Sequence, residues 1–190
     1  MKIRHVGALA AMFLTVSASA VLAQSDPKAE PQYKLLATRR TSTMQKEIDE
    51  VSAQGYRILV GSPTSGTEMA VFLSREGSTE SQFKYKLLAT TRTATMNKEL
   101  NEAAADGYRL IPSTMIAKAG MLMGPEIVMI LERPPVVTKQ YEYKLLATTL
   151  TSTLQKEVTE AQAEGYKIVG MVSRGEHMVV MERETDTRKP

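Results

Sequence analysis

The sequence contains no cysteine, and beyond its first residues it holds a single histidine, His177. The absence of cysteine excludes disulfide bonds, thiolate catalysis and cysteine-ligated metal sites. A catalytic triad or a metalloprotease site would have to be built on His177 without its usual partners nearby in the sequence. We therefore expect a protein that is not an enzyme and has no cofactor, with His177 as an ordinary hairpin residue.

Long hydrophobic runs are also scarce. The one clear run, Val6–Val16, is shorter than the ~20 residues that a membrane-spanning helix needs. It follows Lys2 and Arg4 and precedes Val21-Leu-Ala23, the small-residue pattern that signal peptidase reads. This arrangement predicts a signal peptide at residues 1–23, cleaved after Ala23, and a periplasmic or secreted protein without a membrane span in its mature chain. The alternative is a retained N-terminal anchor.

Charge of either sign is nearly balanced. The formal net charge of +3 falls to +1 when the predicted signal peptide takes Lys2 and Arg4 with it. A chain so close to neutrality has no electrostatic reason to bind nucleic acid, so we expect a protein or envelope partner instead. Residues 24–32 contain no apolar residue beyond Ala29, which predicts a disordered linker, and residues 185–190 are a tail.

One segment is present three times. Residues 33–38 read Tyr-Lys-Leu-Leu-Ala-Thr and return at residues 85–90 and 143–148. A Gly-Tyr pair follows each block, with its tyrosine 23 positions after the first one, and each segment closes on an apolar run ending in arginine. Such periodicity is typical of repeat proteins. It divides the chain into repeat 1 (33–76), repeat 2 (83–134) and repeat 3 (141–184).

Each repeat reads as a β-α-β-β unit. In the opening segment of repeat 2, Tyr85 and Leu87 alternate with Lys86 and Leu88, which predicts a strand. A helix with apolar residues at i, i+4 and i+7 follows, and Ser42-Thr-Met-Gln45 fits the capping box at its start. The glycines of the Gly-Tyr pairs are expected to end the helices at positive φ; they are Gly55, Gly107 and Gly165.

The last strand of each repeat is apolar on both faces, as Ile127–Leu131 shows. Such a strand is expected to be buried on both sides, and one helix covers only one face of a three-stranded sheet. We expect the basic face that carries Lys86 and Leu88 to lie away from the helix. The fold class predicted is α+β, with three sheets sharing a pseudo-threefold core and the helices outside. The alternatives are one continuous sheet or three loosely joined units.

The order of Tyr-Lys-Leu-Leu, helix, Gly-Tyr-Arg-Leu and an apolar strand ending Leu131-Glu-Arg-Pro134 resembles the bacterial family called domain of unknown function 4177. Members of that family carry tryptophan where this chain has Tyr56, Tyr108 and Tyr166. The resemblance implies a β-α-β-β fold in each repeat. It implies no activity and no binding residues.

The hairpin of repeat 2 is longer than the other two and holds Met115, Met121 and Met123. Methionine fills irregular apolar gaps or makes an adaptable contact surface, while thioethers also suit Cu(I). The threonine-rich turns with Arg39, Arg40 and Arg92 could bind an anion, although their hydroxyls already serve as caps. We predict a non-catalytic exported binding protein that uses the three methionines; the alternative is a methionine-rich copper-binding envelope protein.

Overall fold

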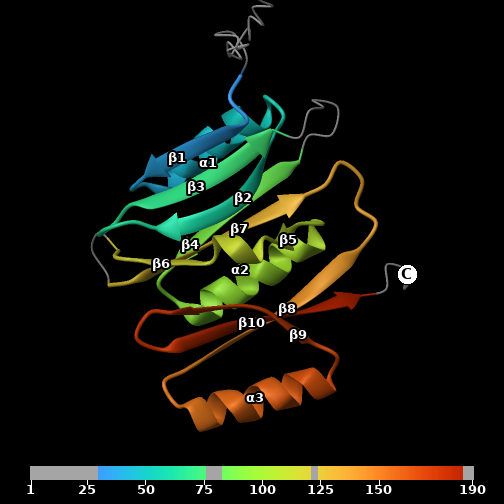
Figure 1. The fold of residues 1–190 in the computed structure, drawn as a ribbon. Coiled ribbons are helices and arrows are strands. Elements are labelled where there is room, and N and C mark those ends of the chain that lie inside the picture. The colour runs from blue at the N-terminus through green and yellow to red at the C-terminus, as the bar shows by residue number, and fades with distance from the viewer. Residues whose placement is uncertain (1–29, 76–82, 121–123, 186–190) are drawn as a thin grey trace, which may run out of the picture. The chain divides into compact units, whose positions relative to one another are not determined.

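The computed structural model describes residues 30–75, 83–120 and 124–185 (Figure 1). Internal contacts divide the chain after Glu30, and residues 31–190 form one unit, which is the unit described below. The predicted signal peptide and almost all of the predicted linker lie outside the described residues, as does the predicted tail beyond residue 185. No helix of the described residues is long and apolar enough to cross a membrane.

The order β-α-β-β occurs three times along the described chain, and each set forms its own antiparallel sheet, so the fold is α+β (Figure 1). In every sheet the last strand is central, giving the orders β1-β3-β2, β4-β7-β5 and β8-β10-β9. The hairpin of repeat 2 adds a short helix η1 and a strand β6 that also pairs with β7. The elements are β1 (Tyr33–Thr38), α1 (Thr41–Ser52), β2 (Tyr56–Pro63), β3 (Met69–Arg75), β4 (Lys84–Thr90), α2 (Thr93–Ala105), β5 (Arg109–Leu110), η1 (Pro112–Thr114), β6 (Ile116–Lys118), β7 (Glu126–Arg133), β8 (Gln140–Thr148), α3 (Thr151–Ala163), β9 (Lys167–Ser173) and β10 (His177–Thr185).

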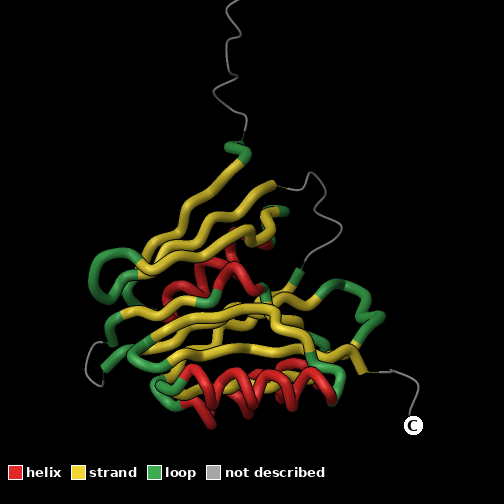
Figure 2. The backbone as a smooth tube through the Cα atoms, turned by 60° about the horizontal axis from the view of Figure 1, so that its bottom comes forward, coloured by secondary structure: helices red, strands yellow, loops and turns green. Residues whose placement is uncertain are grey.

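The repeats pack in series, each against the next. Helix α1 contacts its own strand β1 and also β4 of the second sheet, and α2 likewise contacts β4 and β8. One apolar cluster joins repeats 1 and 2, a second joins repeats 2 and 3, and a third lies between α3 and the third sheet. Figure 2 shows the resulting alternation of strands and helices. The expected pseudo-threefold core with all helices outside is therefore wrong, because α1 and α2 each fill the space between two sheets.

The two faces of each opening strand also point the opposite way from the prediction. Leu88 packs with Met96 and Leu100 of its own helix, whereas Tyr85 and Leu87 pack in the cluster of repeat 1. The alternation along the strand is confirmed, but the basic face points toward the helix of the same repeat. Apolar residues stand on both faces, so the pattern alone does not tell which neighbour covers which face.

The lysines of these basic faces lie over tyrosine rings. The Nζ atoms of Lys34, Lys86 and Lys144 lie 4.4, 4.8 and 4.9 Å from the ring centroids of Tyr56, Tyr108 and Tyr166. The tyrosine that follows each helix therefore serves as a platform for a cation, which is an attraction beyond the simple covering of apolar surface.

Burial of the central strands agrees with the prediction in two of the three sheets. Ile127–Leu131 of β7 are fully buried, and Met178–Met181 of β10 are buried too, because each of these sheets has apolar neighbours on both sides. In β3 the prediction is wrong for Phe72, which is 45% exposed. Phe72 and Ile130 occupy equivalent positions in their sheets. Phe72 pairs with Leu35 and Ile130 pairs with Leu87, and these two leucines are equivalent in the repeats.

Replacing Ile130 with aspartate should lower the free energy of unfolding by more than about 4 kcal/mol, because an unpaired carboxylate would be buried between two repeats. Phe72→Asp, at the same strand position of repeat 1, should cost about 1 kcal/mol or less, because its side chain faces solvent. Urea unfolding followed by circular dichroism measures both variants. Equal losses in the two variants would contradict the serial arrangement.

The glycines that end the helices have φ values of 86°, 86° and 90° at Gly55, Gly107 and Gly165, which confirms the prediction. A Cβ on Gly107 would lie 2.8 Å from Cγ2 of Val137, while on Gly165 its nearest neighbour would be Cδ of Arg183, at 3.6 Å. Gly165→Ala should thus cost about 1 kcal/mol through backbone strain alone. Gly107→Ala should cost about 1 kcal/mol more, because overpacking adds to the strain. Urea unfolding of the two variants checks the difference.

Candidate binding surface

The joint between repeats 1 and 2 uses a helix side chain to pair with the edge of a sheet. Gln45 of α1 donates from Nε2 to the Tyr85 carbonyl (3.1 Å) and accepts at Oε1 from the Leu87 backbone N–H (2.7 Å). These are backbone groups of β4, an edge strand. The predicted capping box at Ser42 is wrong: α1 begins at Thr41, and the residue at its N-cap, Arg40, makes no side-chain cap. The glutamine belongs to the joint and not to its own helix terminus.

The joint between repeats 2 and 3 repeats this arrangement with two asparagines of α2. Asn97 accepts from the Leu145 backbone N–H (2.9 Å), and Asn101 donates to the Tyr143 carbonyl (3.0 Å) and accepts from the Tyr143 N–H (2.9 Å). Side-chain amides thus satisfy the outward backbone groups of β8 as Gln45 does for β4, which removes an exposed sheet edge.

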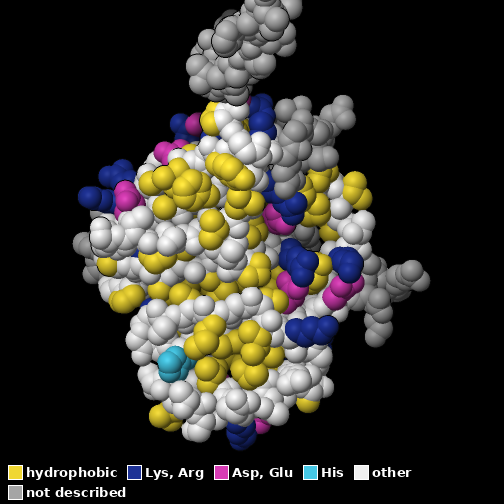
Figure 3. All heavy atoms as spheres, in the orientation of Figure 1, with side chains coloured by type: hydrophobic (Ala, Val, Ile, Leu, Met, Phe, Trp, Pro, Cys, Tyr) yellow, Lys and Arg dark blue, Asp and Glu magenta, His cyan; other side chains and the backbone are white. Residues whose placement is uncertain are grey.

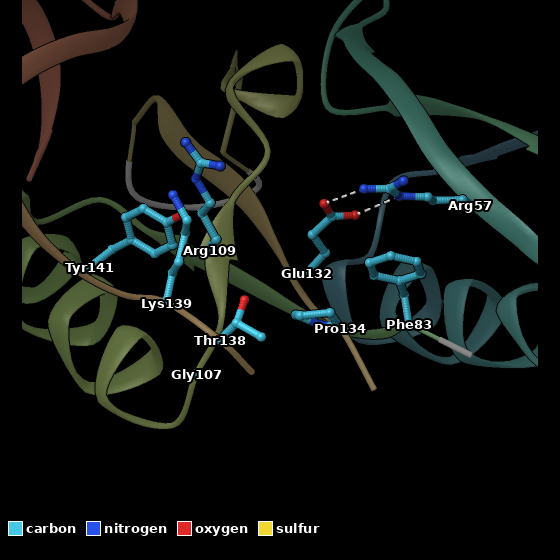
Figure 4. Close-up of a pocket in the computed structure, with 9 residues that line it drawn as sticks. All are labelled: Arg57, Phe83, Gly107, Arg109, Glu132, Pro134, Thr138, Lys139 and Tyr141. Carbon is cyan, nitrogen blue, oxygen red and sulfur yellow. Dashed lines mark hydrogen bonds and ion pairs between the residues drawn. The ribbon is translucent and has the colours of Figure 1, made fainter. Parts of the chain in front are cut away.

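Each joint also contains an arginine clamp to the central strand, at a glutamate that lies opposite the first tyrosine of its repeat in the ladder. Arg57 donates from Nε and Nη2 to the Glu132 carboxylate (3.0 and 2.7 Å) and lies over the Phe83 ring, as the close-up in Figure 4 shows. Arg109 makes the same pair of bonds to Glu182, at 3.1 and 2.8 Å, and lies over a second ring, that of Tyr141. Bidentate pairing fixes the orientation of both groups, so the clamp sets how one repeat sits on the next.

A buried tyrosine hydroxyl connects the clamp to the backbone. Tyr143 accepts from the Leu110 N–H (2.9 Å) and donates to Glu182 (2.8 Å), and Tyr85 accepts in the same way from the Ile58 N–H (3.3 Å). Burial raises the pKa of Tyr143 far above its usual range, so the hydroxyl stays protonated. The hydrogen bond to Glu182 raises the pKa of Arg109 in turn.

A small cavity of about 200 Å³ lies between the two clamps and is lined by Arg57, Arg109, Lys139, Glu132, Phe83, Tyr141, Gly107, Pro134 and Thr138 (Figure 4). Its three cations are all neutralised: Arg57 by Glu132, Arg109 by Glu182, and Lys139 by Glu184 at 2.9 Å. The cavity therefore offers no net positive field to an anion, and we read its residues as structural.

Glu182→Ala should lower the free energy of unfolding by about 2 kcal/mol, because a buried hydroxyl and a bidentate guanidinium lose their acceptor. Glu184→Ala, two residues from Glu182, removes an exposed pair with Lys139 and should leave the free energy of unfolding nearly unchanged. Urea unfolding of both variants checks this, and a double-mutant cycle with Arg109→Ala isolates the coupling. A coupling near zero would show that the clamp does not hold the joint.

Of the three methionines predicted as a binding site, only Met115 lies in the described residues; Met121 and Met123 lie outside them. Met115 is half-buried in the cluster of repeats 2 and 3. Its Sδ lies where a Cβ on Gly170 would stand, so the thioether occupies the space that this glycine leaves. That contact agrees with the gap-filling interpretation of Met115. The described residues contain no group of three His, Asp or Glu side chains able to hold a metal ion.

The threonine turns before the helices cap their own backbone. Thr38, Thr90 and Thr148 accept at Oγ1 from the backbone N–H two residues later, at 3.3, 3.1 and 3.1 Å. The threonine hydroxyls thus have a structural role in all three repeats.

His177 is half-buried at the start of β10, opposite Thr148 and Ser173 in the ladder.

The outer face of the first sheet carries apolar side chains over which the described residues place no further layer. Tyr33 is 59% exposed, whereas its counterparts Tyr85 and Tyr143 are 5% and 3% exposed inside the joints. Leu35, Val60 and Phe72 of the same face are also exposed. We call these four residues the first-sheet face. Figure 3 shows apolar side chains gathered over β1, β2 and β3 in the upper part of the view.

Repeat 3, at the opposite end of the series, also exposes apolar side chains. Ile168 of β9 is 56% exposed, while its counterparts Ile58 and Leu110 are 5% and 3% exposed. Met171 of the same strand is equally exposed and pairs with Val179, on the side of the sheet that α3 covers in part. Together with Gln155 of α3 they form the third-repeat face, and Figure 3 shows apolar side chains gathered over β9 and β10.

Neither face is predicted from the sequence. Tyr33 and Ile168 belong to motifs that read alike in all three repeats, so nothing local marks them as exposed. The polar positions of the repeats do distinguish the two ends. Repeat 1 has Ser74 where the other repeats have their clamp glutamate, and repeat 3 has Lys167 where the others have their clamp arginine.

These features define an α+β protein of three serially packed β-α-β-β units with clamped joints and exposed apolar side chains at both ends of the series. The chain matches no protein-family model, no curated protein and no solved structure. Membership of the domain of unknown function 4177 family therefore stays a prediction that rests on the short motifs.

Proposed function

We propose that this protein is a non-catalytic exported binding protein of the bacterial envelope, periplasmic or secreted, which holds a protein partner on its first-sheet face. The observation that carries the proposal is the exposure of Tyr33, Leu35, Val60 and Phe72 on one sheet face. In repeat arrays the terminal units are normally polar on their outer side, because an apolar end is not compatible with an isolated soluble chain. An exposed apolar patch of this kind is typical of an interaction site.

The character of the face favours a protein partner. Tyrosine, phenylalanine and aliphatic side chains stand together there, and aromatic residues of this kind dominate the centres of protein interfaces. The export of the chain is inferred from Lys2, Arg4 and the Val21-Leu-Ala23 cleavage pattern. The non-catalytic assignment is inferred from the single histidine that follows this segment and from the lack of cysteine.

The test is recovery of bound proteins from an envelope extract on immobilised wild-type protein, Phe72→Asp and Ala94→Asp. Ala94 is exposed in the first turn of α2, where an aspartate is favoured, so it controls for the added charge. We expect at least one protein to bind the wild type and Ala94→Asp and to be lost from Phe72→Asp. A second copy of the chain counts as such a protein. Identical recovery on all three would contradict the proposal.

A further inference from the structure

We propose that the occupant of the first-sheet face is the third-repeat face of a second copy of this chain, so that chains associate head to tail. This inference rests on the proposed function, since it names the partner of that face. Its basis is that the two joints inside the chain already show what covers such a sheet face, namely the helix side of the preceding repeat.

The sheet side of the joint is preserved in repeat 1. Tyr33 pairs with Ser74 in the ladder as Tyr85 pairs with Glu132, so the two tyrosines occupy the same place. Tyr85 is covered by repeat 1, and Tyr33 presents the same ring and hydroxyl to solvent. Leu35 repeats the place of Leu87 in the same manner, and both residues lie on edge strands.

The helix side of the joint is preserved in repeat 3. Gln155 stands where Gln45 stands, 12 positions after the first tyrosine of its repeat, and its exposed amide is bonded only weakly within α3, to Thr159 at 3.3 Å. Docked on a second copy, it would reach the carbonyl of Tyr33 and the N–H of Leu35, as Gln45 reaches β4. The N–H of Ile168 would meet the Tyr33 hydroxyl, as that of Ile58 meets Tyr85.

The clamp is a part of the joint that the ends lack. Lys167 replaces the arginine, Ser74 replaces the glutamate, and Pro31 stands where Phe83 and Tyr141 provide the stacking rings. Apolar contact and edge pairing are therefore kept, while bidentate pairing is lost. The joint between chains should for this reason be weaker than the joints within a chain, and the association should be reversible.

A head-to-tail contact is heterologous: the two surfaces that meet are different. Phe72→Asp damages only the sheet surface, and Ile168→Asp damages only the helix surface. Both side chains face solvent within one chain, so each variant should fold. Circular dichroism and thermal unfolding verify this before association is measured.

The experiment is sedimentation velocity of the purified protein over a range of concentrations. We expect the wild type and Ala94→Asp to self-associate as concentration rises, and Phe72→Asp and Ile168→Asp each to stay monomeric. An equimolar mixture of Phe72→Asp and Ile168→Asp should form a dimer that does not grow further, because one intact surface of each kind is present. A dimer that survives Ile168→Asp and is lost in Phe72→Asp would mean that two first-sheet faces pair with each other, and it would overturn the proposal.

A second measurement adds the missing clamp. Ser74→Glu combined with Lys167→Arg should tighten self-association about tenfold relative to the wild type, because it supplies a bidentate pair across the joint. Ser74→Glu alone is the control and should have a smaller effect. An unchanged association constant in the double variant, or no growth of the wild type up to about 1 mM, would overturn the inference.

The two proposals fail separately. If the purified protein is monomeric while a Phe72-dependent partner is recovered from the extract, the head-to-tail inference is wrong and the binding function stands. If neither association nor a Phe72-dependent partner is found, both are wrong.

Discussion

Each inner helix of this protein must bury two sides, one against its own sheet and one against the next sheet, and the rest of the structure depends on that constraint. It explains why β7 and β10 are apolar on both faces, with residues such as Val128 and Val180 fully buried. A unit of about 45 residues has too small a core to be stable alone, and a helix shared between two sheets supplies the missing half. Within the described part of the chain, the same constraint leaves one sheet face and one helix side uncovered at the two ends.

Polar groups decide how the shared layers fit together. Apolar contact between a helix and a sheet is tolerant of sliding, whereas the pairing of Gln45 with the backbone of β4 and of Arg109 with Glu182 has a defined geometry. Both kinds of contact satisfy groups that would otherwise be costly at a buried joint: an edge-strand backbone and a tyrosine hydroxyl. Stability thus comes chiefly from the apolar layers, and the relative placement of the repeats comes from these few bonds.

The separate roles of apolar layers and polar pairs also bear on the proposed binding. The end faces keep the apolar and edge-pairing parts of the joint and lack the clamp, since Ser74 and Lys167 stand at its positions. Such a surface has the apolar contacts of an internal joint but lacks the bidentate ion pair, which fixes orientation most strongly. Open-ended stacking of repeat proteins is a hazard when both ends stay complementary, and a weakened end joint limits it.

The sequence by itself determined the three β-α-β-β units, the α+β class, the alternation along the strands and the positive φ of Gly107, because these follow from local periodicity and backbone sterics. Tertiary structure decided which layer covers which face. Tyr33 and Tyr85 sit in identical motifs, yet one is exposed and the other buried, since burial depends on whether another repeat precedes it. The role of Gln45 was likewise hidden, because its partners are about 40 residues away and a capping box is the nearest local use for the same side chain. Local pattern fixes the units, and only their packing order defines the two ends, one of which we propose as the binding surface.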